Sequence, residues 1–272
     1  MLRSGTKNNI GFTLIELSIV LVIIGLVVGG VMVGRDLIEA ASIRKIGSEL
    51  QSISVSVNTF RIKYDCLPGD CQNATQVFGV NSSGCPVGGG LTGTCDGNGD
   101  GFINAFSVVG NVEHLYAWQQ LSLANLITWS FSGSDIGGGT GWQYLDVGRN
   151  LPASSFNNEI GYVFYSVRTS AAGSYKKTIE IGANIPVGAN GDVLCGAGLN
   201  AIQAASLDIK FDDGLPESGK IFAVSGGSTI SPYNAVPTHS SSVNSYTTCV
   251  NNNLYIQSPD TGCTMEYKPD IP

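Results

Sequence analysis

The stretch Gly11-Phe12-Thr13-Leu14-Ile15-Glu16-Leu17 opens an apolar run that continues to Gly34. Residues 12–34 carry no charged side chain except Glu16. As a helix that rises about 1.5 Å per residue, this run reaches roughly 35 Å, which is enough to cross the hydrocarbon core of a bilayer. A carboxylate within such a span is costly unless it is paired, so Glu16 predicts both a function and a partner.

The residues before the run predict its orientation. Arg3 and Lys7 precede it, and no acidic residue occurs before Glu16. Positively charged flanks remain in the cytoplasm. We therefore expect a cytoplasmic segment at residues 1–11, a transmembrane segment at 12–34, and everything after Gly34 on the outside.

The same stretch resembles the processing motif of type IV prepilins and type II secretion pseudopilins. The resemblance implies that a prepilin peptidase cuts after Gly11 and that Phe12 becomes the methylated N-terminus. It also implies that Glu16 pairs with the Phe12 amine of a neighbouring subunit in a filament. A well-made pair offsets much of the cost of a buried charge and can set the stagger between subunits.

Two simpler interpretations explain these residues less well. A secretory signal peptide is cut after its apolar segment at a small-x-small site. Here the run leads into Arg35-Asp36-Leu37-Ile38-Glu39, which has no such site. A plain membrane anchor needs no Gly-Phe-Thr-Leu-Ile-Glu motif, so neither alternative accounts for residues 11–16.

The helix is predicted to continue beyond the membrane. Apolar residues recur at alternating steps of three and four, which gives one apolar stripe over an amphipathic segment at residues 35–64. We expect this stripe to pack on a sheet, with a short coiled coil as the alternative. The stripe consists of Ile43, Ile46, Leu50, Ile53, Val57, Phe60 and Tyr64.

The remaining chain, residues 65–272, is acidic and rich in cysteine. It contains 17 acidic and 7 basic residues, so no nucleic acid is expected as a partner. All seven cysteines lie in this part of the chain, which suits a disulfide-braced domain in an oxidising compartment. Short spacing favours the pairs Cys66–Cys71 and Cys85–Cys95, and a C-terminal pair Cys249–Cys263 is a clasp of the kind that major pilins often have. Cys195 is then left over, and its pairing with Cys249 or Cys263 is an alternative that sequence leaves open.

A glycine-rich loop within this domain resembles a calcium loop of the EF-hand type. Oxygen ligands at alternate residues and a glycine at the sixth position, Gly101, match that pattern. The twelfth position is Ser107 instead of a bidentate glutamate, so an ion would need Glu113 or another carboxylate. The alternative is a glycine-rich turn without an ion. The candidate Ca²⁺ ligands are Asp96, Asn98, Asp100, Phe102 through its carbonyl, and Asn104.

The rest of the domain predicts a second short helix and an antiparallel sheet. Residues 111–127 have a helical apolar face, and we expect His114 in its first turn to lie at the surface. Several runs have the composition or alternation of strands. These are residues 161–168 and 175–181 as a hairpin, 207–211, 219–224 and, more weakly, 254–256.

The predicted fold class is therefore α+β: a long N-terminal helix, membrane-spanning in its first half, packed on an antiparallel sheet with long disulfide-braced loops. This arrangement is similar to the pilin roll. No nucleophile elbow, Walker-type phosphate loop or zinc spacing occurs, so no catalytic residues are assigned. The resemblance implies a structural subunit of a type IV pilus or a type II secretion pseudopilus, and not an enzyme. Alternatives are a tip-located adhesin, a cargo-binding subunit, or a membrane-anchored enzyme.

The resemblance also implies where the protein acts and with what. Its partners would be the prepilin peptidase, other pilin or pseudopilin subunits, the inner-membrane assembly platform and membrane lipid. It would reside in the inner membrane with its globular domain in the periplasm or outside the cell, and in a filament after assembly. After cleavage 261 residues would remain of 272, which is large for a repeating pilin and favours a minor subunit.

Overall fold

The computed structural model describes residues 13–85, 92–104, 112–134, 145–168, 175–183, 196–225, 249–258 and 262–271. Its contacts divide the chain into two compact units, Met1–Ser42 and Ile43–Pro272. The expectations for Gly11, Phe12, Cys195 and Ser107 lie outside the described residues.

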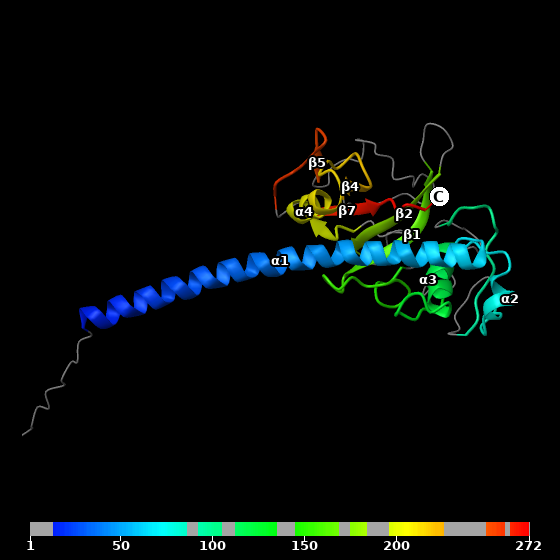
Figure 1. Cartoon of the computed structure of the whole chain (residues 1–272), viewed down its shortest axis with the longest axis horizontal. Coiled ribbons are helices and arrows are strands. Elements are labelled where there is room, and N and C mark those ends of the chain that lie inside the picture. Colours follow the sequence, from blue (N-terminus) through cyan, green and yellow to red (C-terminus); the bar gives the residue numbers. More distant parts are fainter. Residues whose placement is uncertain are drawn as a thin grey trace, which may run out of the picture. The chain divides into compact units, whose positions relative to one another are not determined.

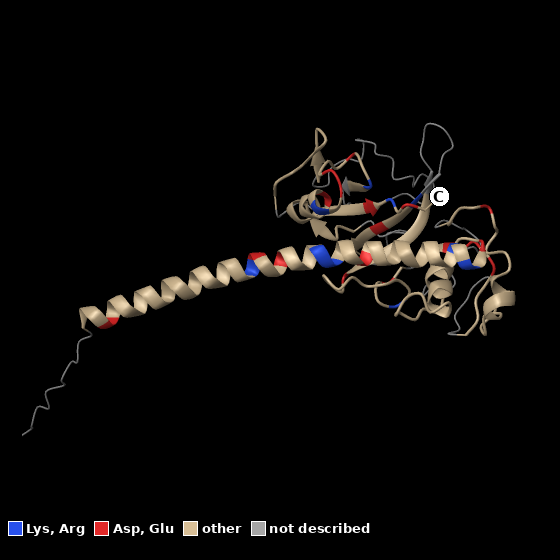
Figure 2. Ribbon diagram, in the orientation of Figure 1, with Lys and Arg blue, Asp and Glu red and all other residues tan. Residues whose placement is uncertain are grey.

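Helix α1 spans Leu14–Tyr64, which confirms the expected long N-terminal helix (Figure 1). Within the first unit its large apolar side chains are exposed, from 51% at Val20 to 89% at Leu14. Among the described residues, α1 is the helix that is long and apolar enough to cross a membrane, and none of its most apolar window is buried in the molecule. This stretch shows almost no charge in Figure 2.

In the second unit α1 contributes its apolar stripe to the core. Six of the seven expected stripe residues are at most 1% exposed, and the seventh, Tyr64, is partly buried. Gly47 lies on the same face, where an added Cβ would fall 2.0 Å from the ring of Phe211. The absence of a side chain at Gly47 therefore lets that ring lie directly against α1. The six fully buried residues are Ile43, Ile46, Leu50, Ile53, Val57 and Phe60.

A polar contact also joins α1 to the sheet. Glu49 accepts hydrogen bonds from Tyr162 Oη at 2.5 Å and from Ser154 Oγ at 2.9 Å. The backbone N–H of Ser155 donates to the other carboxylate oxygen at 3.1 Å. Because Tyr162 is fully buried, these bonds satisfy a phenol that would otherwise be costly to bury.

Among the described residues, the main sheet has five strands and is antiparallel. Strands β1 (Ile160–Arg168) and β2 (Tyr175–Ala183) pair along their full length, as the predicted hairpin requires. Strand β7 (Gly262–Tyr267) pairs with β2 and β3 (Leu199–Asn200), and also with β4 (Ile221–Ser225). Strands β5 (Val250–Asn251) and β6 (Leu254–Tyr255) form a separate pair.

The part of the chain that the structure describes also contains helices α2 (Ala74–Phe78), α3 (Glu113–Leu123) and α4 (Ala201–Phe211). Helices α3 and α4 lie at opposite ends of the sheet in Figure 1. The strand prediction for residues 207–211 is wrong, because these residues form the second half of α4. A capping box between Asn200 and Gln203 starts this helix, and its buried residues recur at helical spacing.

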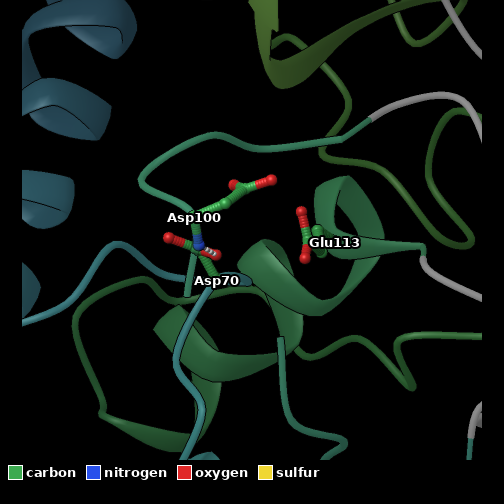
Figure 3. Close-up of side chains that lie close together, drawn as sticks. All are labelled: Asp70, Asp100 and Glu113. Atoms are coloured by element: carbon green, nitrogen blue, oxygen red, sulfur yellow. Dashed lines mark hydrogen bonds between the residues drawn. The ribbon is translucent and has the colours of Figure 1, made fainter. Parts of the chain in front are cut away.

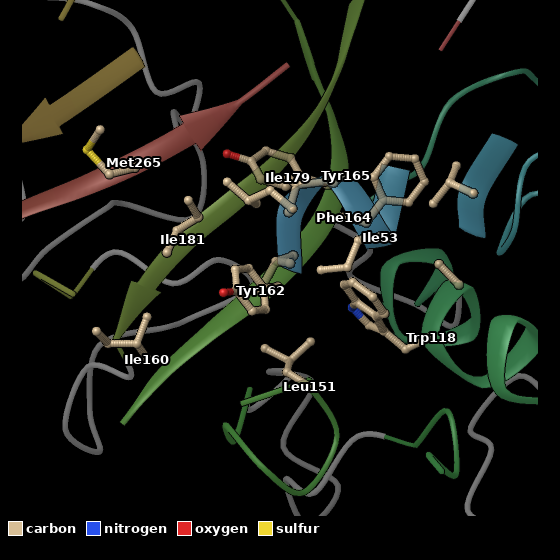
Figure 4. Packing of buried hydrophobic residues seen from close by; sticks show 14 of the residues in the cluster. Ile53, Trp118, Leu151, Ile160, Tyr162, Phe164, Tyr165, Ile179, Ile181 and Met265 are labelled. Atoms are coloured by element: carbon tan, nitrogen blue, oxygen red, sulfur yellow. The ribbon is translucent and has the colours of Figure 1, made fainter. Parts of the chain in front are cut away.

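The core is built where α1 and α3 meet the β1–β2 hairpin. Trp118 from α3 and Ile53 from α1 lie beside the aromatic side chains of β1 (Figure 4). Tyr162, Phe164 and Tyr165 of that strand are at most 1% exposed. These contacts confirm an α+β fold in which the second half of the long helix packs on an antiparallel sheet.

Candidate functional site

The start of α1 forms a capping box around Glu16. The Thr13 backbone N–H and hydroxyl both donate to Glu16 Oε2, at 2.8 and 2.7 Å. The Glu16 backbone N–H donates back to Thr13 Oγ1 at 3.3 Å. The first turn of a helix leaves its N–H groups without intrahelical partners, and this reciprocal pair satisfies two of them. Glu16 therefore has a partner within its own chain.

Thr13 is a site residue that the sequence interpretation passed over. Its signal was present, since Thr-x-x-Glu before an apolar run is the spacing of a capping box. Glu16 remains exposed, so the contact with Thr13 leaves it open to a further partner. Pairing of Glu16 with the Phe12 amine stays a prediction.

In the predicted calcium loop, the first candidate ligand is directed elsewhere. Asp96 accepts hydrogen bonds from the Thr75 N–H at 2.7 Å and the Thr75 hydroxyl at 2.9 Å. Thr75 lies in the first turn of α2, where a carboxylate interacts favourably with free N–H groups. Asp96 is thus a local anchor of α2 in this structure.

The other predicted ligands gather around Asp100. Its Oδ2 accepts a hydrogen bond from Asn98 Nδ2 at 2.9 Å and lies 3.5 Å from Asn104 Nδ2, while its Oδ1 accepts from the Phe102 N–H at 2.9 Å. Here Phe102 contributes its N–H, whereas the predicted ion contact used its carbonyl.

Two carboxylates from outside the loop complete the cluster. Ligand atoms of Asp70, Asp100 and Glu113 all lie within 4.8 Å of one another. Figure 3 shows these three side chains converging, with Asp70 from the turn after α1 and Glu113 from the first turn of α3. Asp70 is 4% exposed and Glu113 is fully buried, whereas Asp100 is exposed. Glu113 was named from sequence as a replacement ligand, but Asp70 was not.

Backbone N–H groups of the loop donate hydrogen bonds to the two buried carboxylates, Asp70 and Glu113. Asp70 accepts from the N–H groups of Gly99, Asp100 and Gly101 at 2.7, 3.1 and 2.8 Å. Glu113 accepts three further bonds, from the Asn98 N–H at 3.0 Å and from the N–H and side-chain amide of Asn104, both at 2.9 Å.

Burial raises the pKa values of Asp70 and Glu113 above their usual range, because desolvation disfavours the charged forms. The neighbouring carboxylates act in the same direction: Asp100 raises the pKa of Asp70, and Asp70 and Asp100 raise that of Glu113. The backbone N–H donors lower both pKa values, but they do not outweigh burial. A cation at this position would relieve the repulsion and favour the ionised forms.

The donor set fits a hard cation. A carboxylate oxygen has about two lone-pair positions, and carboxylate oxygen is the ligand that Ca²⁺ prefers. By the hydrogen bonds among described residues, Asp70 Oδ2, Glu113 Oε1 and Asp100 Oδ1 each accept one bond. Each keeps a lone pair, so three carboxylates could hold an ion whose remaining ligands would be water or carbonyl oxygens.

A second acidic group lies at the end of α4. Ligand atoms of Asp208, Asp212 and Asp213 lie within 4.8 Å of one another. Asp208 is fully buried and accepts hydrogen bonds from Tyr255 Oη at 2.6 Å and from the Gly214 N–H at 3.1 Å. Burial, reinforced by the two nearby aspartates, raises the pKa of Asp208 to about 6.

The structure contains the three expected cysteine pairs. Disulfides join Cys66 to Cys71, Cys85 to Cys95, and Cys249 to Cys263. The first closes the turn that carries Asp70. The second ends directly before the predicted calcium loop at residues 96–104, the acidic loop. Two bridges therefore hold the segments that bring the Asp70 and Asp100 carboxylates together.

His114 lies in the core, so the expectation of a surface histidine is wrong. It is fully buried on α3, and its Nδ1 lies 3.2 Å from the Asn104 carbonyl oxygen. Burial lowers the pKa of His114 to about 4, which keeps it neutral at ordinary pH. With Nδ1–H donating to a carbonyl, the histidine fixes the end of the acidic loop.

Comparison with known families identifies the N-terminal segment. The prokaryotic N-terminal methylation motif matches residues 6–32. This motif is the hallmark of the type IV prepilin and pseudopilin family, and it supports a pilin-like or pseudopilin subunit with a structural role. Comparisons with curated proteins and with solved structures gave no match.

Proposed function

We propose that the chain is a structural subunit of a type IV pilus or a type II secretion pseudopilus, because it carries the methylation motif of type IV prepilins and pseudopilins. The single observation behind this proposal is the motif at residues 6–32, at the start of a helix able to span a membrane. In this role the peptidase cuts after Gly11, Phe12 is methylated, and Glu16 pairs with the Phe12 amine of a neighbour.

The proposed topology follows the charge and cysteine distribution. Residues 1–11 form the cytoplasmic leader, 12–34 the transmembrane part of α1, 35–64 its amphipathic part and 65–272 the exported domain. The three disulfides support an oxidising compartment for the last of these. The partners are the prepilin peptidase, the inner-membrane assembly platform, membrane lipid and other subunits.

Processing provides the first test. Gly11→Val places a β-branched side chain at the residue before the cut and should leave an uncut precursor in the inner membrane. Gly5→Val, outside the quoted motif, should be cut normally. N-terminal mass spectrometry reads the outcome, and a mature terminus at Phe12 in the Gly11 variant would exclude cleavage that depends on this glycine.

Within the filament we propose a minor subunit. The mature chain of 261 residues, 272 less the 11 of the leader, is large for a repeating unit. A tip-located adhesin or a cargo-binding subunit is the more specific alternative, because long disulfide-braced loops offer contact surface. Counting copies relative to the other subunits in sheared, purified filaments distinguishes these roles, and an abundant repeat would contradict a minor subunit.

We also propose that the exported domain binds Ca²⁺ at the acidic loop. The support is the oxygen-rich loop at residues 96–104 together with the convergence of Asp70, Asp100 and Glu113. Asp100 is a predicted ligand within the loop that also belongs to this group, and Glu113 is the replacement ligand that the sequence suggested. Asn98, Phe102 and Asn104 remain candidates close to Asp100, whereas Asp96 would have to leave Thr75 to reach an ion.

A further inference from the structure

The acidic loop contains three consecutive pairs that are prone to a spontaneous reaction: Asp96-Gly97, Asn98-Gly99 and Asp100-Gly101. The backbone nitrogen of each glycine can attack the side-chain carbonyl carbon of the preceding residue, and the absence of a glycine Cβ makes that approach easy. At Asn98 the new C–N bond closes a succinimide and expels ammonia. Water then opens the ring to a normal or an iso-linked aspartyl residue, so an amide nitrogen is replaced by a water oxygen without any redox change.

In the folded protein each attacking nitrogen is engaged. The Gly99 N–H donates to Asp70 Oδ1 at 2.7 Å, and the Gly101 N–H donates to Asp70 Oδ2 at 2.8 Å. The Gly97 N–H donates to the Cys71 carbonyl oxygen at 2.8 Å. All three acceptors belong to the last two residues of the turn that the Cys66–Cys71 disulfide closes.

The side chain under attack is held as well. Asn98 Oδ1 accepts from the Asp100 N–H at 2.9 Å, and Asn98 Nδ2 donates to Asp100 Oδ2 at 2.9 Å. Asn98 is nevertheless exposed to water. For ring closure its amide must leave both contacts and the Gly99 N–H must leave Asp70. The loop must therefore open locally before the reaction proceeds.

We propose that Asn98 is a deamidation site. In the folded protein Asp70 slows the reaction by holding the Gly99 N–H, and local opening of the loop allows it. Deamidation would change the loop, because the Asn98 side-chain amide, which now donates to the Asp100 carboxylate, would become a carboxylate itself. Two like charges would then replace a hydrogen bond, within a group that already holds Asp70 and Glu113. The inference depends neither on filament assembly nor on calcium.

The test measures deamidation of the full-length protein in detergent micelles at mildly alkaline pH. Peptide mapping with mass spectrometry separates the aspartyl and isoaspartyl products formed from Asn98. We expect the native protein to react there at least about tenfold more slowly than the same protein in urea, a factor that corresponds to about 1.4 kcal/mol of opening free energy. Asp70→Ala should approach the rate in urea while the domain stays folded. Asp70→Asn, which keeps one acceptor oxygen, should lie between. Asp270→Ala removes an exposed carboxylate elsewhere and should leave the native rate unchanged.

Near-ultraviolet circular dichroism decides whether each variant is folded. If Asp70→Ala unfolds the domain, the comparison passes to Asp70→Asn, whose rate must then exceed that of the native protein. Equal rates at Asn98 in the native protein and in urea would overturn the proposal. So would a folded Asp70 variant that deamidates no faster than the unmodified chain.

Discussion

Glu16 is the residue on which both the local structure and the proposed assembly depend. In the single chain it closes the first turn of α1 by accepting two hydrogen bonds from Thr13. In a filament, the proposed Phe12 amine of a neighbour would add a positive charge to the same carboxylate. Thr13 can thus position Glu16 before assembly, and it partly compensates the cost of carrying a carboxylate into the membrane.

Substitution at Glu16 separates membrane insertion from assembly. Glu16→Ala removes a costly membrane carboxylate, so the subunit should insert at least as well as the unmodified chain. It should enter filaments poorly, because the neighbouring amine loses its partner. Thr13→Val is the matched control, since it removes the hydroxyl contact but keeps the charge, and it should still be incorporated. Quantitative immunoblots of sheared filaments and membranes measure both steps, and normal incorporation of Glu16→Ala would contradict the pairing.

Calcium should stabilise the exported domain through Asp100. Binding to the folded state alone adds RT ln(1 + [L]/Kd) to the free energy of unfolding, about 2.7 kcal/mol at a hundredfold excess over Kd. The Tm of the full chain in detergent should therefore rise with Ca²⁺ and fall on chelation. Asp100→Ala should abolish the difference, Glu159→Ala at an exposed site should keep it, and Mg²⁺ should act poorly because it demands tighter octahedral geometry.

A wild-type Tm that does not respond to millimolar Ca²⁺ would mean that the loop is a turn without an ion. In that case the five backbone N–H groups that bind Asp70 and Glu113 would suffice to order it. The sequence predicted the loop and its Asp100 from local spacing. It could not predict Asp70 as a neighbour, because that contact depends on how a separate disulfide-closed turn folds against the loop.

At the scale of elements, long periodic signals were predicted correctly and short ones only in part. The short runs 219–224 and 254–256 overlap strands β4 and β6, whereas the prediction for 207–211 is wrong. The α1 stripe and the β1–β2 hairpin extend over enough residues for periodicity to identify them. Residues 207–211 alternate like a strand over only five positions, whereas Ala201, Ala204 and Ala205 show the helical face once the whole of α4 is considered. Strand β7, which joins β2, β3 and β4, was missed because its pairing partners are distant in sequence.

Burial of Asp208 on α4 should make the stability of the domain depend on pH. Asp208 has a pKa of about 6 in the folded protein, above its value of about 3.9 in an unfolded chain. Its folded state therefore binds the proton more tightly. The associated stabilisation is present below about pH 4 and is lost as the pH rises through about 6. A shift of this size corresponds to about 3 kcal/mol at most.

Asp208→Asn tests this linkage, because the amide does not titrate and can still accept from Tyr255 Oη. The difference in Tm between the variant and the unmodified chain should change between pH 4 and pH 7, with the variant losing the Asp208 contribution to the pH dependence. Asp270→Asn, at an exposed ion pair, is the control and should show a much smaller change over this range. Parallel pH profiles for Asp208→Asn and the unmodified chain would show that Asp208 does not titrate there.

For the molecule as a whole, the three disulfides are linked to the proposed export of residues 65–272. A domain of 208 residues, from 65 to 272, is large enough to bury a core, and its sequence contains long glycine-rich loops. Bridges reduce the conformational entropy of such loops in the unfolded chain. Disulfides form and persist mainly in oxidising compartments, so the three pairs agree with the proposed topology, in which residues 1–11 are cytoplasmic and residues 65–272 are exported.

Thiol labelling tests that topology on the intact protein. Three disulfides use six of the seven cysteines, so labelling under denaturing, non-reducing conditions should modify one thiol per chain, and peptide mapping should assign it to Cys195. Reduction before labelling should raise the number to seven, and Cys195→Ser should reduce the unreduced value to zero. The matched change Cys249→Ser should instead free Cys263 and lower the Tm, since loss of a native bridge typically costs about 2–5 kcal/mol. Seven free thiols in protein purified from the cell envelope without reductant would contradict export of this domain, because an oxidising compartment would have formed the bridges whose cysteines already lie within reach.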